Sequence, residues 1–154
     1  RSTQGYSSAA SDVYKRQQPI IASHSSSKAL CDHDRNLTDE QLRALAKNGG
    51  VAQLCLLDAY INKNPKAASV CDAAEHLDHM IKVAGIDHVG IGTDFDGGGG
   101  LQGCKGDNDL INLTIKMIEK GYTEEDLRKI WGGNLLRVMK QVQEAPLLSS
   151  KKRR

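Results

Sequence analysis

The stretch HVGIGTDFDG, residues 88–97, is the basis for predicting the fold of this chain. Small and apolar residues lead without a charge into Thr93 and Asp94, and a run of glycines follows. Parallel strands covered on both faces have this continuous apolar character, and their ligands bind beyond their carboxyl ends. The stretch therefore predicts a buried strand with the Asp94 carboxylate at its tip. Two roles remain open for Asp94: a working residue of a site, or an aspartate that caps the following turn.

Two further strands are predicted upstream of this one. Residues 19–24 (PIIASH) form a short apolar run that begins with Pro19, a residue tolerated at the first position of a strand. His24 stands at its tip, as either a hydrogen-bonded structural residue or a ligand. Residues 50–57 (GVAQLCLL) form a third apolar run. Because a second strand delivers Asp94 to the same edge of the sheet, a ligand role for His24 gains support.

Helix signals separate the strands. Thr38 and Gln41 form a capping box, and Ser69 can cap a helix over residues 70–84. A further helix is predicted over residues 107–120, with Ile118 on its buried face. Two more helices are predicted, one starting at residue 123 and one capped by Asn134.

Alternating strands and helices give parallel neighbouring strands, but three strands alone leave two open edges. The predicted fold class is α/β: the C-terminal part of a (β/α)8 TIM barrel, about three βα units plus terminal helices, with its site at the carboxyl ends of the strands.

Length and composition suit one domain, since the 154 residues are 39% hydrophobic. The net charge of +2 comes from the ends: residues 1–17 carry +2 and residues 151–154 carry +4, which leaves −4 on residues 18–150. No basic patch interleaved with aromatic residues suggests nucleic acid, and no apolar run has the length of a transmembrane span. Cys31, Cys55, Cys71 and Cys104 are widely spaced, which favours reduced thiols.

The two ends are expected to lie outside the fold. Residues 1–17 (RSTQGYSSAASDVYKRQ) resemble translated adaptor sequence and are interpreted as non-native or disordered. Residues 146–154 are predicted to be a disordered basic tail, with targeting or polyanion binding as the alternative. Residues 18–145 are then the folded domain.

Three other groups of polar residues are candidates for a site. Arg35 follows the first strand on a polar loop, where its guanidinium could hold a substrate carboxylate through two parallel hydrogen bonds. The adjacent residues 32–34 cannot converge on a metal without a sharp turn and are expected to be solvated. His76 and His79 lie one helical turn apart and could share a metal, but their charged neighbours favour solvent-exposed histidines.

With His24, Arg35 and Asp94 in place, the chain resembles the membrane dipeptidase family, the renal dipeptidase-like zinc peptidases of peptidase family M19. The matching segments are PIIASHSSSKALCDHDRN, AAEHLDHMIKVAGIDHVGIGTDFDG and NLLRV, and the resemblance runs from about residue 19 to residue 143. It implies a (β/α)8 barrel of the metal-dependent hydrolase type with a centre of two Zn²⁺ ions, of which this chain would hold strands six to eight.

The resemblance also implies roles for single residues. His24 would be a zinc ligand, Arg35 would grip the carboxylate of a dipeptide, and Asp94 would lie near the substrate amino group and the reacting water, as a substrate-binding and catalytic residue. Asp96 would shape the loop. These types suit the chemistry, because a metal pair activates water and polarises the carbonyl, and neutral imidazole is a good zinc ligand. The expected activity is zinc-dependent dipeptide hydrolysis by the full-length protein. A homodimer is common in the family, and the sequence leaves the compartment open between the cytoplasm and the cell envelope.

The chain also departs from the family pattern. A His-x-Asp pair on strand one, a bridging Glu, a further zinc-ligand His and an oxyanion-binding His have no counterpart in residues 1–18. One zinc ligand cannot hold two zincs. The expectation is therefore that this chain is a fragment of the enzyme and inactive alone.

Two other functions compete with the hydrolase. Gly98-x-Gly100-x-x-Gly103 matches a phosphate- or dinucleotide-binding pattern, although that pattern should open a helix directly. The other alternative is a non-catalytic protein that pairs its open sheet with a partner.

Overall fold

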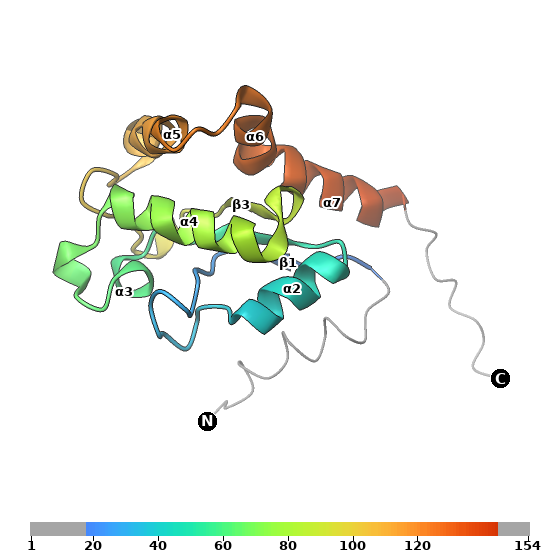
Figure 1. Ribbon diagram of the computed structural model, residues 1–154, viewed down its shortest axis with the longest axis horizontal. Coiled ribbons are helices and arrows are strands. Elements are labelled where there is room, and N and C mark those ends of the chain that lie inside the picture. Colours follow the sequence, from blue (N-terminus) through green and yellow to red (C-terminus); the bar gives the residue numbers. More distant parts are fainter. Residues whose placement is uncertain (1–17, 145–154) are drawn as a thin grey trace.

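The computed structural model describes residues 18–144. Strands β1 (Ile21–Ala22), β2 (Val51–Leu54) and β3 (Val89–Ile91) form one parallel sheet in the order β1-β2-β3 (Figure 1). Ala52 of β2 pairs with Ala22 on one side and with Val89 on the other. All three predicted strands are confirmed, and each is shorter than its apolar run. The predictions for residues 1–17 and 146–154 lie outside the described residues.

The helices between the strands begin where the sequence predicts. Helix α2 (Asp39–Lys47) starts at a capping box of Thr38 and Gln41, and helix α4 (Val70–Ala84) starts at one formed by Ser69 and Asp72. In each box the cap hydroxyl accepts the third helical N–H while that residue's side chain accepts the cap N–H, so local sequence alone fixes both starts. A short helix, α3 (Asp58–Ile61), follows β2 directly.

Helix α4 lies across the sheet, with α2 on one side and α5 (Leu110–Glu119) on the other (Figure 1). The core between them is fully buried at Leu77, Met80, Leu113 and Met117. The prediction that Ile118 lies inward is wrong, because its side chain is 56% exposed. Helical periodicity marks an apolar face, but α5 buries Leu113 and Met117 of that face fully and Leu110 partly, and leaves Ile118 in solvent.

The C-terminal part runs through α6 (Glu124–Arg128), a π-helical segment (Lys129–Gly133) and α7 (Asn134–Glu144). The sequence predicts Asn134 as a helix cap, but it is the first residue of α7. Its buried side-chain Nδ2 donates to the carbonyls of Ile86 and Val89, both at 2.7 Å. One turn later, the Arg137 guanidinium donates to the carbonyls of Gly49 and Asp87, both at 2.8 Å. These bonds tie α7 to the amino ends of β2 and β3, which explains two polar positions of the NLLRV segment.

No helix within residues 18–144 is long and apolar enough to cross a membrane. All four cysteines are free thiols, three of them buried and Cys71 exposed.

Candidate functional site at the carboxyl ends of the strands

The polar residues that follow the three strands are brought to one edge of the sheet. The Ser25 amide donates to the Gln53 carbonyl at 2.9 Å, and the Leu56 amide donates to the Thr93 carbonyl at 3.2 Å. The Ser26 hydroxyl donates to the Cys55 carbonyl at 3.1 Å. Because backbone bonds continue past the ends of the strands, the segments carrying His24, Cys55 and Asp94 lie side by side.

His24, after β1, is held at both ring nitrogens. Its Nε2 lies 3.2 Å from Arg35 Nη2, and its Nδ1 lies 2.8 Å from the Ser23 hydroxyl. A guanidinium only donates hydrogen bonds, so Nε2 accepts here and the neutral ring carries its proton on Nδ1. The predicted site residues His24 and Arg35 are thus in direct contact, and the Nε2 lone pair faces the Arg35 guanidinium.

The loop that carries Arg35 is anchored by Asn36 and His33. Asn36 is buried: its Nδ2 donates to the carbonyls of Cys31 and Tyr60, and its Oδ1 accepts from the Ser26 amide at 3.0 Å. The Arg35 amide donates to His33 Nδ1 at 3.1 Å. The Arg35 side chain itself is exposed on a fixed backbone. Sequence reasoning missed the anchoring role of Asn36, because its partners lie up to 24 residues away.

Asp94, after β3, has an unusual backbone. Its φ of 61° and ψ of 30° place it in the left-handed region, and it is the one non-glycine residue with positive φ within residues 18–144. Aspartate tolerates this region better than most residues, and such conformations cluster at functional sites. Its carboxylate Oδ2 lies 3.8 Å from the Cys55 sulfur.

Cys55 stands between the other two strand tips. Burial raises the pKa of its thiol to about 11, nearby Asp94 adds to the rise, and Arg35 opposes it. The thiol is therefore protonated at neutral pH and can donate to the Asp94 carboxylate. Sequence analysis identified Cys55 only as a reduced thiol, since its proximity to Asp94 spans 39 residues.

His24 suits a metal, but the described residues do not form a complete metal site. Its neutral ring, with Nδ1 held by a hydroxyl and a lone pair on Nε2, is the form that zinc ligands adopt. Within residues 18–144, however, there is no group of three or more His, Cys, Asp or Glu side chains placed to hold a metal ion. These residues could therefore supply one ligand of a zinc centre.

The glycine-rich loop after Asp94 does not present an anion cradle. The amides of residues 97–102 all donate to backbone carbonyls; for example, Gly99 donates to Asp94 at 2.8 Å and Gly100 to Leu56 at 2.8 Å. A 3₁₀ turn (Asp107–Asp109) separates the loop from α5. Because these N–H groups are already used within the protein, the geometry disfavours phosphate or dinucleotide binding.

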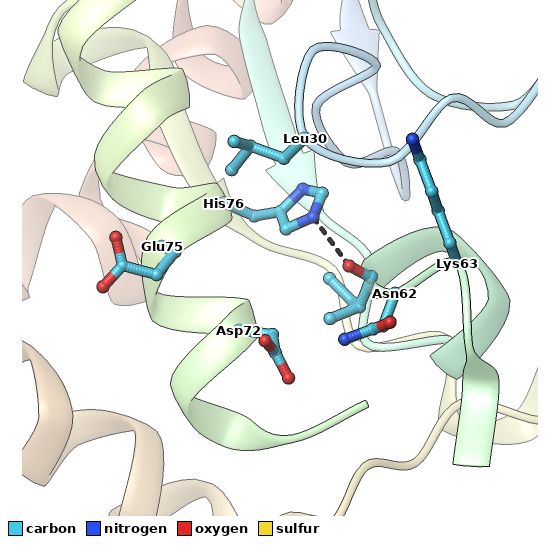
Figure 2. A pocket seen from close by; sticks show the side chains of 7 residues that line it. Leu30, Asn62, Lys63, Asp72, Glu75 and His76 are labelled. Atoms are coloured by element: carbon cyan, nitrogen blue, oxygen red, sulfur yellow. Dashed lines mark hydrogen bonds between the residues drawn. The ribbon is translucent and has the colours of Figure 1, made fainter. Parts of the chain in front are cut away.

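A separate pocket of about 370 Å³ lies between α3 and α4 (Figure 2). The prediction of a solvent-exposed His76 is wrong: the residue is 2% exposed and lines the inner wall of this pocket. Its Nε2 donates to the Ile61 carbonyl at 2.9 Å, and its Nδ1 accepts from the Ser27 amide at 3.1 Å. Burial lowers the pKa of His76. With both nitrogens used, His76 is a structural histidine. His79 instead pairs with Asp39 at 2.8 Å.

The fold is therefore α/β, and the candidate site lies at the carboxyl ends of its parallel strands. The family model of the membrane dipeptidases (Peptidase family M19) matches residues 8–153, and the chain belongs to this family. The matched range includes residues 8–17 and 145–153, which lie outside the described part of the structure.

Similar proteins include dipeptidases and metallopeptidases. An uncharacterized dipeptidase of Schizosaccharomyces pombe is 43% identical over 139 residues, which are 87% of this chain and 33% of that protein. The probable dipeptidase PvdM of Pseudomonas aeruginosa superposes with a TM-score of 0.81 at 27% identity, covering 85% of this chain and 46% of that one. A metallopeptidase of Rhodobacter sphaeroides, solved with a phosphinate mimic of the dipeptide L-Ala-D-Ala, has a TM-score of 0.79 at 30% identity and covers 84% and 38%. The chain spans about a third of the length of its curated relatives.

Proposed function

We propose that residues 18–144 form the last three βα units, strands six to eight, of the (β/α)8 barrel of a zinc-dependent dipeptidase. The observation that carries the proposal is the convergence of His24, Arg35 and Asp94 on one edge of a parallel sheet, in a chain of the membrane dipeptidase family. The Rhodobacter relative, which binds a phosphinate dipeptide mimic, supports a dipeptide as the substrate.

Each of the three residues has a role that its chemistry suits. His24 would ligate zinc through Nε2, the atom that accepts from Arg35 in this structure. Zinc, when bound, would polarise the scissile carbonyl and lower the pKa of a water. The exposed Arg35 guanidinium would bind the free carboxylate of the dipeptide, and the Asp94 carboxylate would bind its free amino group and accept a proton from the reacting water.

The Arg35 cation and the Asp94 anion lie on one edge of the sheet. They suit a substrate whose carboxyl and amino termini are both free. This pairing would restrict the enzyme to dipeptides. The remaining zinc ligands would lie outside residues 18–144, and the 154-residue chain alone would not hydrolyse dipeptides.

A chimera tests the proposal. Residues 18–144 would replace the matching segment of the Rhodobacter metallopeptidase, and hydrolysis of L-Ala-D-Ala would be compared with that of its C-terminal amide. The chimera should cleave the free dipeptide in preference to the amide. Arg35→Lys should lower kcat/KM for the free dipeptide about 10- to 100-fold, the worth of a charge-assisted pair. Arg43→Lys, at an exposed arginine of α2, is the matched control. A folded chimera without activity, or full activity of Arg35→Lys, would contradict the proposal.

A further inference from the structure

The Asp94 carboxylate is enclosed on one side by a glycine that the backbone does not require. Gly97 does not have a positive φ, so an alanine could adopt its backbone conformation. A Cβ built at position 97 would nevertheless lie 2.3 Å from Asp94 Oδ1 and 2.8 Å from Asp94 Cγ. The space that a side chain at residue 97 would fill is thus occupied by the Asp94 carboxylate.

Cys55, from the tip of β2, also contacts the carboxylate. The Cys55 sulfur lies 3.8 Å from Asp94 Oδ2, and Cys55 is fully buried. A thiol is a weak hydrogen-bond donor, but this one is shielded from water and has a carboxylate as its acceptor.

The Asp94 backbone is fixed as well. Its carbonyl accepts from the amides of Gly97 at 3.0 Å and Gly99 at 2.8 Å, so the chain folds back over Asp94 immediately after it. A Cβ at Gly99 would lie 2.5 Å from the Thr93 carbonyl oxygen, so this return also needs a glycine. Backbone and side chain of Asp94 are therefore both constrained, and the constraint on the side chain comes from two elements far apart in the sequence.

We propose that Gly97 and Cys55 are positioning residues that clamp the Asp94 carboxylate between the glycine-rich loop and the tip of β2. The inference rests on the proposed function for its consequence, since a fixed carboxylate would meet the substrate amino group without reorganising. The clamp also accounts for the glycines that follow Asp94, whereas phosphate binding does not.

The steric half of the clamp is tested by a double-mutant cycle on the 154-residue chain, with thermal unfolding as the readout. Gly97→Ala should lower the Tm by about 2–4 °C, because the Asp94 carboxylate must turn away from the new Cβ. In an Asp94→Gly background, which removes the carboxylate and tolerates positive φ, the same substitution should have little effect. Gly106→Ala is the control, because its φ is extended and a Cβ there would meet nothing within 4 Å. Equal losses in both backgrounds would overturn the inference, as would failure to fold in both. Folding only without the carboxylate would support it.

The Cys55 half has a spectroscopic readout. The side-chain ¹³C carboxyl resonance of Asp94 at neutral pH should move when Cys55→Ala removes the donor, and Cys55→Ser, which keeps a donor, should restore it towards the parent position. An unmoved resonance in Cys55→Ala would overturn the role of Cys55. Neither measurement uses a substrate, so an inactive chimera would refute the proposed function while leaving the clamp to stand or fall by these tests.

Discussion

Replacing Asn134 by alanine should destabilise the protein more than any change on its surface. Asn134 is 3% exposed, and its side-chain amide donates two hydrogen bonds of 2.7 Å, to the carbonyls of Ile86 and Val89. Alanine removes both donors and leaves two carbonyls without them. Each lost bond costs about 1 kcal/mol net, and a buried group left unsatisfied costs about 1–3 kcal/mol. The expected loss in the free energy of unfolding is therefore about 2–4 kcal/mol, a large share of the roughly 5–15 kcal/mol that stabilises a domain.

Urea unfolding is the assay for this prediction. Trp131 is the single tryptophan, lies three residues from Asn134 and packs against the core, so its fluorescence reports on this region. The midpoint should fall by about 1–2 M, given an m value of about 2 kcal/mol/M. Asn108→Ala, at an exposed asparagine, is the control and should change stability by less than about 0.5 kcal/mol.

The variant Asn134→Asp sharpens the test. It keeps the shape of the side chain but turns oxygens towards the two carbonyls, so it should be less stable than Asn134→Ala. A loss below about 1 kcal/mol in Asn134→Ala, or an Asn134→Asp variant as stable as the parent, would refute the reasoning that these two bonds hold α7 to the sheet.

Burial lowers the pKa of His76 from its ordinary value of 6.5, so the unfolded chain binds a proton at this side chain more readily than the folded chain does. The free energy of unfolding should therefore fall as the pH drops from 6.5 to the lowered pKa. His76→Gln should remove this part of the pH dependence, measured by urea unfolding at several pH values. Arg137→Lys cannot reach two separate carbonyls and should cost about 1–3 kcal/mol by thermal unfolding, whereas an unchanged Tm would count against the tether. A thiol reagent should label Cys71 rapidly in the native protein and all four cysteines after unfolding; rapid native labelling of a second cysteine would contradict the buried positions.

What could be predicted from sequence were the features that depend on nearby residues. The cap residues Thr38, Ser69 and Thr123 predicted three helix starts, because a cap bonds within four residues of its own position. The structure shows a capping box at each of them. The apolar runs predicted the strands, and the order of strands and helices predicted a parallel sheet. The rule that sites lie at carboxyl ends of parallel strands then placed His24 and Asp94 on one edge.

The remainder depends on contacts between distant parts of the chain. The burial of His76 follows from its packing against α3, which the polar neighbours on α4 could not reveal. The pairing of Asn134 with β3 spans 45 residues, and that of Cys55 with Asp94 spans 39. Ile118 was misplaced because periodicity indicates an amphipathic helix without saying which neighbour covers which side.

The most direct test of the central claim is zinc content and dipeptide hydrolysis, measured on one preparation of the chimera that carries residues 18–144. His24→Ala should lose bound zinc and hydrolysis together, since Nε2 of His24 is the proposed ligand atom. His79→Ala, at a histidine that only pairs with Asp39 on α2, should keep both. Full zinc content and full activity in His24→Ala would contradict the assignment of a metal site to this edge of the sheet.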